Sequence, residues 1–398
     1  MIDLRAARSD RDGFRSALAR KGAAAVDAFD RMLAADERWR ALVPRVDELR
    51  ARQNLKGKPT PEQLEELGRI KEELRALEEE LAAAEAERDE WLAQVPNPPD
   101  PTAPDGASEE DAQELRRVGD PPPEGPEHTE VGRFELERAA RLSGSRFGFM
   151  VGDTALVALA LYRFALDRAG GRGYTPVLPP VLVREEAMYG TGFFPTDRTN
   201  IYALEADELY LTGTAEVALA GMHMTEILQE LPIRYSGFST CFRRESGAAG
   251  KDTRGLFRVH QFNKVELFVY CEPERSPEEH ERLLAIEEEL AKALELPYRV
   301  VNVAAGDLGA PAAKKYDIEA WFPSQQRYRE ITSTSNTTDF QARRLGIRHR
   351  VDDKRLESPH TLNGTAVTDR WLLALLENFR GEVPDVLLQY GAPPRVGR

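Results

Sequence analysis

The residues best suited to chemistry lie in one segment, residues 241–270, which reads CFRRESGAAGKDTRGLFRVHQFNKVELFVY. We expect two strands joined by a long basic connection, with Arg243, Glu245, Phe262 and Glu266 on one side. A guanidinium there can grip a phosphate, an aromatic ring can stack on a base, and a carboxylate can hold an ammonium group. The alternative is a surface hairpin with ordinary cross-strand ion pairs. The segment alone leaves both interpretations open.

Other common nucleotide and metal motifs are missing from the sequence. Neither a GxxxxGK[ST] loop nor a GxGxxG turn opens a strand-to-helix unit, so a Walker-type or dinucleotide site is not predicted. The two cysteines, Cys241 and Cys271, form no CxxC pair, and the six histidines are scattered. We therefore expect neither a disulfide scaffold nor a zinc site. His260 and His360 are interpreted as structural residues rather than general bases.

The composition limits the class of protein to which the chain can belong. The 398 residues include 54 basic and 68 acidic side chains, which gives a net charge of −14. A hydrophobic content of 41% with 31% charged residues predicts two or three folded domains and excludes wholesale disorder. No run approaches the ~20 apolar residues of a membrane helix, and the first residues lack a signal peptide's pattern, so we expect a cytoplasmic protein without a membrane partner. The acidic total argues against DNA as a partner, although a local basic strip could bind phosphate.

Two helices that form an antiparallel coiled-coil hairpin are predicted for residues 1–95. Thr60-Pro61-Glu62-Gln63 should begin the second helix, with an N-cap, a first-turn proline and a reciprocal capping residue. Pro44 should interrupt and kink the first helix. Apolar residues recur at heptad spacing in both helices: Met32, Ala35, Trp39, Leu42, Val46 and Leu49, then Leu67, Ile70, Leu74, Leu77, Leu81, Ala84, Trp91 and Val95.

The rest of the chain divides into a linker and a mixed domain. Residues 96–132 are rich in proline and acid, which predicts a linker that forms no core of its own. From residue 133 to residue 398, strand-like runs alternate with helical patterns. This pattern predicts an α+β domain.

The segment 241–270 resembles motif 2 of the class II aminoacyl-tRNA synthetases, and the chain as a whole resembles the bacterial-type seryl-tRNA synthetases. GYTPVLPP at 173–180 is similar to motif 1, read as a helix followed by a strand that ends at Pro180. Thr214-Ala215-Glu216 resembles the serine pocket, and YREITSTSN at 328–336 resembles a glutamate-and-serine stretch. TLNGTAVTDRWLLALLENF at 361–379 is similar to motif 3, with Arg370 opening a helix. The resemblance implies an antiparallel class II sheet flanked by helices and preceded by the hairpin.

The resemblance also implies a role for individual residues. Arg243 and Arg370 would be catalytic. Glu330 and Ser333 would ligate Mg²⁺. The ATP site would comprise Arg243, Arg244, Glu245, Arg258, Phe262, Glu330, Ile331, Thr332, Ser333 and Arg370. The serine site would comprise Thr214, Ala215, Glu216, Glu266, Asn363 and Thr365, and the tRNA-binding arm would use Arg50, Arg52, Lys56 and Lys58.

The implied activity is that of an ATP-dependent, AMP-forming serine–tRNA ligase, in which a homodimer is held together at motif 1. Serine tRNA, and selenocysteine tRNA where present, would be the acceptor. Three alternatives stay open: a zinc-dependent enzyme that loads serine onto a carrier protein, a non-catalytic tRNA-binding homologue, and a specialised paralogue that supplies or protects seryl-tRNA. Taken singly, several residues also have plain structural readings, with Pro180 as a strand end, Glu266 in an ion pair, Arg370 at a helix end, and Thr365 as a turn residue or N-cap.

Overall fold

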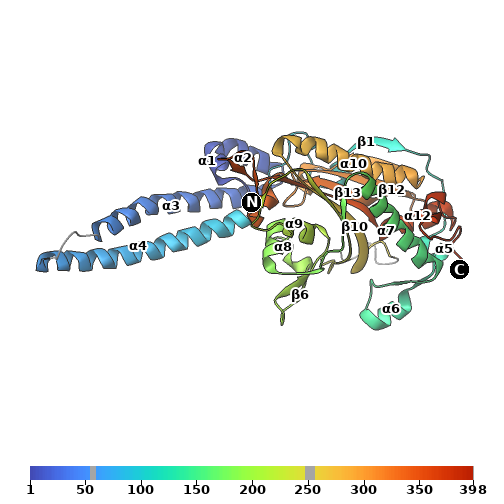
Figure 1. Ribbon diagram of the computed structural model, residues 1–398, viewed down its shortest axis with the longest axis horizontal. Helices are drawn as coiled ribbons and strands as arrows, with labels where there is room; N and C mark the ends of the chain where they lie inside the picture. Colours follow the sequence, from blue (N-terminus) through green and yellow to red (C-terminus); the bar gives the residue numbers. More distant parts are fainter. Residues whose placement is uncertain (54–59, 247–255, 398) are drawn as a thin grey trace. The chain divides into compact units, whose positions relative to one another are not determined.

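The computed structural model describes residues 1–53, 60–246 and 256–397, and the chain forms two compact units, Met1–Pro98 and Pro99–Arg398 (Figure 1). The first unit is helical, with α1 (Leu4–Ser9), α2 (Arg11–Ala19), α3 (Ala23–Gln53) and α4 (Pro61–Gln94). α4 begins with the predicted capping box, because Thr60 and Gln63 each bond the other's backbone N–H. This start of the second helix is confirmed.

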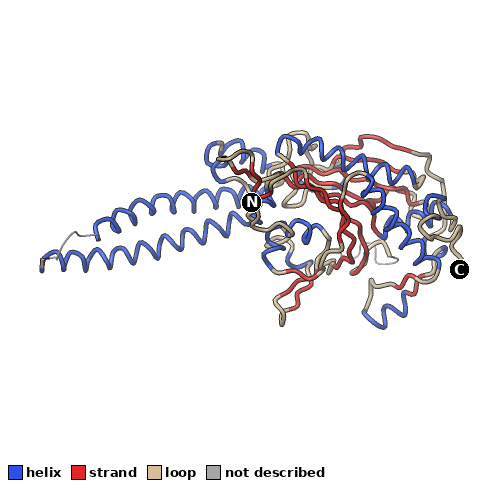
Figure 2. The backbone as a smooth tube through the Cα atoms, viewed as in Figure 1, coloured by secondary structure: helices blue, strands red, loops and turns tan. Residues whose placement is uncertain are grey.

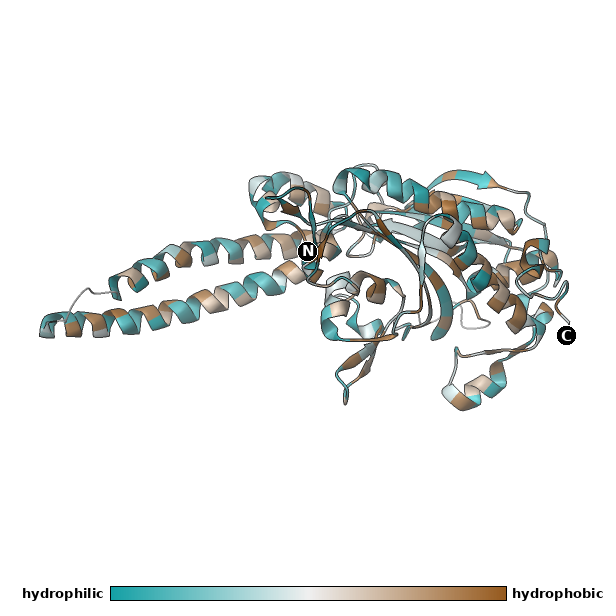
Figure 3. Ribbon diagram, in the orientation of Figure 1, coloured by the Kyte–Doolittle hydropathy of each residue, from teal (hydrophilic) through white to brown (hydrophobic). Residues whose placement is uncertain are grey.

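α3 and α4 form the predicted antiparallel hairpin. Their contact buries apolar heptad residues, among them Val46, Leu49, Ile70, Leu74 and Leu77. Hydrophilic and hydrophobic residues alternate along both helices (Figure 3). Pro44 lies inside α3 and does not interrupt it, so that part of the prediction is wrong. Burial of Val46 and Leu49 just beyond the proline favours continuing the helix and offsets the hydrogen bond that proline removes.

The second unit is built on a large sheet, drawn in red in Figure 2. Its described strands run in the order β1-β11-β12-β13-β16-β10-β9-β4. All neighbouring pairs are antiparallel except β4 with β9. This architecture confirms the predicted α+β class. The strands are β1 (Gln113–Val118), β4 (Thr175–Val177), β9 (Ile233–Phe242), β10 (Gln261–Cys271), β11 (Tyr298–Asn302), β12 (Lys314–Phe322), β13 (Arg327–Asn336) and β16 (His360–Thr368).

Alternation along β10 gives the sheet two different faces. Val265, Leu267 and Val269 point into the main core. That core is closed by the helices α7 (Asp153–Gly171), α10 (Ser276–Ala293) and α12 (Asp369–Phe379). Phe268 and Tyr270 face the other way and pack with α9 (Glu216–Gly221) and α11 (Phe340–Leu345). The other even-numbered positions of β10 hold one aromatic and two charged residues, Phe262, Lys264 and Glu266.

Short elements complete the second unit around this sheet. Two small three-stranded sheets and one two-stranded sheet lie outside it in the described chain. These elements are α5 (His128–Val131), β2 (Phe134–Glu135), α6 (Leu136–Ser143), β3 (Phe149–Met150), β5 (Leu182–Val183), α8 (Glu185–Thr191), β6 (Tyr202–Leu204), β7 (Leu209–Leu211), β8 (Ile227–Leu228), β14 (Arg348–Arg350), β15 (Leu356–Glu357) and α13 (Asp385–Leu388).

Two details differ from the sequence prediction. The stretch 96–132 contains the edge strand β1, which pairs with β11, and Ala103 packs in a small core with Val303. Proline prevents this stretch from forming a core of its own but not from adding a strand to an existing sheet. The motif 1 strand ends at Val177 rather than Pro180, because Pro179 and Pro180 have no N–H for a ladder. Among the described residues, no helix is long and apolar enough to cross a membrane.

Candidate active site

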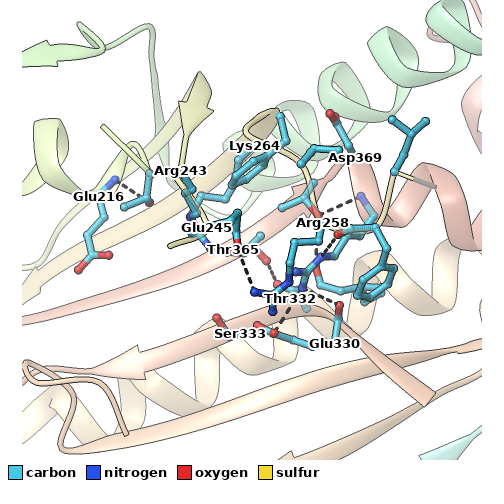
Figure 4. Close-up of a pocket in the computed structure, with 18 of the residues that line it drawn as sticks. Glu216, Arg243, Glu245, Arg258, Lys264, Glu330, Thr332, Ser333, Thr365 and Asp369 are labelled. Atoms are coloured by element: carbon cyan, nitrogen blue, oxygen red, sulfur yellow. Dashed lines mark hydrogen bonds and ion pairs between the residues drawn. The ribbon is translucent and has the colours of Figure 1, made fainter. Parts of the chain in front are cut away.

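A pocket opens on the polar face of the sheet, above β10, β13 and β16, with a cavity volume of about 180 Å³ (Figure 4). An outer cavity of about 460 Å³ shares Arg243, Glu245, Arg258, Glu330 and Arg370 with it. The inner pocket is lined by Phe193, Thr214, Glu216, Arg243, Glu245, Leu256, Phe257, Arg258, Val259, Phe262, Lys264, Glu330, Ile331, Thr332, Ser333, Asn363, Thr365, Thr368, Asp369 and Arg370.

Two irregularities in strand pairing place side chains in this pocket. On β13, Thr332 pairs with Ile318 and Glu330 with Glu319, so Ile331 is an extra residue without a partner. In a regular strand Glu330 and Ser333 would face opposite sides, and the bulge brings both to the pocket. On β16, Thr365 pairs with Glu266 and Val367 with Val265, so Ala366 is the extra residue. That bulge lets Thr365 and Thr368 both line the pocket.

Arg243 is held where β9 ends. Its backbone N–H donates to the His260 carbonyl at 2.9 Å, and its own carbonyl lies 2.9 Å from His260 Nδ1. Its Nε donates to the Gly213 carbonyl at 3.3 Å, and its guanidinium carbon lies 5.1 Å from the centre of the Phe262 ring. His260 thus has the expected structural role. Arg243 and Glu245 lie just beyond the strand rather than at alternate strand positions, yet both reach the pocket.

Two arginine–carboxylate pairs line one part of the pocket, where Figure 4 labels Arg258, Glu245 and Glu330. Arg258 Nη1 lies 2.8 Å from Glu245 Oε2, and Arg370 Nη1 lies 3.3 Å from Glu330 Oε2. Desolvation opposes ionisation of Glu330, but the charges of Lys315, Arg370 and Arg243 outweigh it and hold its pKa at about 2. Glu330 is therefore an anion at any physiological pH, surrounded by cations.

Carboxylates and hydroxyls gather around the other part of the pocket. Glu266 is fully buried below it, and accepts hydrogen bonds from Asn363 Nδ2 at 3.1 Å and Thr365 Oγ1 at 3.3 Å. Lys264 Nζ lies 2.6 Å from Glu266 Oε2. Burial, and then the charge of Glu266, raise the pKa of Glu216 to about 7. Glu266 therefore takes part in an ion pair beneath the pocket, and Thr365 is a strand residue rather than a cap.

Most of the predicted site residues line this one pocket, but three do not. Arg244 points away, with its guanidinium carbon 5.7 Å from the centre of the Tyr202 ring. Ala215 is buried beside the pocket, and Glu266 lies underneath it, where it acts through Asn363 and Thr365. The pocket's chemistry therefore rests on the remaining predicted residues.

The predicted basic residues of the hairpin belong to the first unit. Arg50 Nη2 lies 2.8 Å from Glu78 Oε1, and Arg52 Nη2 lies 3.1 Å from Glu66 Oε1, so both bridge the two helices. Lys56 and Lys58 fall outside the described residues.

Lys264, Asp369 and Phe193 line the pocket without having been predicted. Lys264 lies midway between Phe262 and Glu266 in the sequence. The alternation of side chains along a strand therefore predicts that Lys264 faces the same side as these two residues. Asp369 accepts hydrogen bonds from the Tyr162 hydroxyl and from the Asn263 N–H at 3.1 Å, and burial raises its pKa to about 6. Phe193 comes from the loop after α8, and its sequence neighbours carry no signal that places it in the pocket.

A mainly antiparallel sheet, with α7, α10 and α12 on one face and a pocket that holds three arginines on the other, is typical of the catalytic core of a class II aminoacyl-tRNA synthetase. Residues 201–379 match the tRNA synthetase class II core domain (G, H, P, S and T). Residues 1–99 match the seryl-tRNA synthetase N-terminal domain.

Individual relatives narrow the assignment. A serine–tRNA ligase of Thermobifida fusca is 47% identical, with 100% of this chain and 98% of the relative covered. The seryl-tRNA synthetase of Pyrococcus horikoshii, solved with ATP, superimposes with a TM-score of 0.93 and 39% identity, covering 100% and 99% of the two chains. The cytoplasmic enzyme of Naegleria fowleri, solved with AMP, gives a TM-score of 0.87 and 33% identity, covering 96% and 94%. The chain belongs to the serine–tRNA ligase family.

Proposed function

We propose that this protein activates serine with ATP and transfers it to the 3′ end of serine tRNA, and of selenocysteine tRNA where that is present. One observation carries the proposal: a single pocket combines three arginines suited to a polyphosphate with buried carboxylates and hydroxyls suited to a small hydroxyl amino acid. Family membership over the full chain supports the same activity.

The part of the pocket around the two arginine–carboxylate pairs is assigned to ATP. Arg243 would contact the α-phosphate, while Phe262 stacks on the adenine and Glu245 accepts from its amino group. Arg258 and Arg370 would grip the β- and γ-phosphates, exchanging their carboxylate partners for phosphate oxygens. The aromatic contact between Arg243 and Phe262 supports this placement, because it sets the guanidinium beside the proposed base platform.

Mg²⁺ fits the residues of the ATP site. The donor set is a carboxylate, Glu330, and a hydroxyl, Ser333, which the β13 bulge turns to the same side. Hard oxygen ligands of this kind, completed by phosphate oxygens and water, are those that Mg²⁺ prefers. The low pKa of Glu330 keeps it in the form that ligates a cation. When bound, the ion would neutralise charge on the phosphates.

The part of the pocket around Glu216 is assigned to serine. Glu216 would hold the ammonium group, and Thr214, Asn363 and Thr365 would surround the small side chain. Glu266 orients Asn363 and Thr365 from below. A site of this kind rejects alanine, because the polar groups that meet the serine hydroxyl would be left unpaired.

In the first step the serine carboxylate attacks the α-phosphorus in line, which forms seryl-adenylate and releases pyrophosphate. No side chain needs to become covalently attached, so the chain contributes positioning and charge stabilisation. Arg243 would stabilise the charge that develops on the α-phosphate, and Arg370 the charge on the leaving group. In the second step a hydroxyl of the terminal ribose attacks the seryl carbonyl, and AMP leaves.

The hairpin and the motif 1 region are assigned to partners. The α3–α4 hairpin would hold serine tRNA through its backbone, with the basic residues near its tip neutralising phosphates. A homodimer would form around α7 and the strand after it. This is supported by the exposed apolar side chains Leu156, Leu159 and Leu178, which are 47%, 60% and 81% exposed. A cytoplasmic location follows from the activity.

Pyrophosphate exchange with each of the twenty amino acids tests the activation step. We expect strong exchange with serine, weak exchange with threonine and negligible exchange with alanine. Exchange that is strongest with another amino acid, or that is absent with all twenty, would refute the assignment of the pocket to serine.

A further inference from the structure

Gln341 is a fully buried residue of α11 that touches the serine side of the pocket without lining it. Its Nε2 donates to Glu216 Oε1 at 2.7 Å and to the Thr191 carbonyl at 3.2 Å. Its Oε1 accepts from Thr361 Oγ1 at 2.9 Å and from Thr337 Oγ1 at 3.3 Å. Both amide hydrogens are therefore used, and Thr361 supplies the stronger donor to the amide oxygen, because the single hydroxyl hydrogen of Thr337 lies closer to the Thr361 carbonyl, at 2.7 Å.

These four contacts fix which way the amide points. If it were reversed, its oxygen would face the Thr191 carbonyl and the ionised Glu216 carboxylate, neither of which can donate a hydrogen bond. The two threonine hydroxyls close the opposite side, and they also lie 2.6 Å from each other. The donor directed at Glu216 is therefore set by residues outside the pocket.

The second contact of the amide joins Glu216 to the wall of the pocket. Thr191 ends α8, Gly192 follows with φ of +90°, and Phe193 then lines the cavity. The neighbouring Arg344 donates to the carbonyls of Tyr189 and Phe194, at 2.9 and 3.0 Å. α11 thus holds both ends of this turn while Gln341 bonds its middle.

We propose that Gln341 is a positioning residue for serine recognition, which orients the Glu216 carboxylate and ties it to the turn that carries Phe193. The proposal rests on the assignment of Glu216 to the serine ammonium group. Its bond to Glu216 favours the ionised carboxylate, as do the charges of Lys264 and Arg243, against the effect of burial and of Glu266. Removing the donor should therefore disturb both the pose and the protonation of Glu216.

The test compares Gln341→Leu with the unchanged protein in serine-dependent pyrophosphate exchange. We expect the KM for serine to rise about ten-fold or more, because a charged buried acceptor loses its donor, while the KM for ATP changes less than about two-fold. The acid limb of kcat/KM for serine should move to higher pH. Gln341→Glu should move it further, because two carboxyl groups would then face each other.

A matched control separates this role from a loss of stability. Leu345→Ala removes a buried side chain of the same helix without touching the hydrogen bonds, so it should lower the unfolding temperature and leave the acid limb in place. If Gln341→Leu fails to fold, Thr361→Val removes one donor to Gln341 and should shift the serine KM and the acid limb in the same direction, by less.

Two outcomes would overturn the role of Gln341. One is a folded Gln341→Leu variant in which neither the KM for serine nor the acid limb of kcat/KM for serine changes. The other is a variant in which the KM values for serine and for ATP rise equally. An unchanged protein without serine-dependent exchange would instead refute the proposed function, and this inference with it.

Discussion

Glu287 should destabilise the protein at neutral pH, and replacing it should raise the stability. It lies on α10, against the face of the sheet opposite the pocket, and is fully buried. No described residue donates a hydrogen bond to either of its carboxylate oxygens. A Cβ placed on Gly364 would lie only 2.6 Å from Glu287 Oε1, so the carboxyl group sits directly behind the strand that carries Asn363 and Thr365.

The pH dependence follows from the direction of the pKa shift. Burial, and then the charges of Glu266 and Asp317, raise the pKa of Glu287 well above its usual value. The unfolded chain releases the Glu287 proton above about pH 4.3, whereas the folded protein keeps it. The free energy of unfolding therefore falls as the pH rises from this value toward the raised pKa of the folded protein. In this window each pH unit lowers the free energy of unfolding by about 1.4 kcal/mol.

Two substitutions separate the cost of ionisation from the cost of burial. Glu287→Gln removes the titration, so its advantage over the unchanged protein should grow as the pH rises above about 5. Glu287→Leu also removes the unpaired polar atoms, which should add about 1–3 kcal/mol at every pH. One kcal/mol corresponds to about 2–4 °C in a domain of roughly this size.

Denaturant unfolding at pH 5, 6, 7 and 8 measures both effects. Glu278→Gln is the matched control, because Glu278 is on the same helix with a side chain that is 74% exposed, and it should change stability by less than about 0.5 kcal/mol. Parallel pH profiles for the unchanged protein and Glu287→Gln, or a less stable Glu287→Leu, would refute this reasoning.

Three further predictions concern the ATP site and the hairpin. Arg243→Ala should leave the unfolding temperature nearly unchanged and slow seryl-adenylate formation by about a hundred-fold or more, since one charge-stabilising contact contributes about 3 kcal/mol; near-normal exchange would mean that motif 2 is misplaced. Activity should be lost with EDTA, restored by Mg²⁺, and unaffected by a zinc-selective chelator; stoichiometric zinc in the purified protein would contradict this. Removal of residues 1–98 should preserve serine-dependent exchange and dimer mass in light scattering while tRNA charging falls steeply; full charging, or inactive monomers, would show that the hairpin serves another purpose.

Local sequence patterns were enough to predict much of the fold. The capping box at Thr60 and the heptads of α3 and α4 are set by neighbouring residues, and the sequence was enough to predict them. The strand β1 was missed because its pairing partner, β11, lies far along the chain and supplies what its own composition lacks. Pro44 was over-interpreted, because tertiary packing outweighs the cost of one proline in a long helix.

The identity of most candidate site residues could be predicted from the sequence, but the way in which the strands orient them could not. The family resemblance was enough to predict most of the residues that form the site. The bulges at Ile331 and Ala366 determine which of these residues lie on the same face of the sheet. A bulge depends on register between two strands, and one strand's sequence does not specify it. Gln341 could not be found from the sequence for a similar reason, since α8, α9, β16 and the loop after β13 meet around its amide.

Charging of a serine tRNA transcript with labelled serine tests the central claim most directly. Purified protein with ATP, Mg²⁺ and this transcript should form an ester at the 3′-terminal ribose, at one serine per tRNA, and no ester with threonine or alanine. An enzyme that supports serine-dependent exchange but leaves the transcript uncharged would contradict the account and favour a different acceptor for the activated serine.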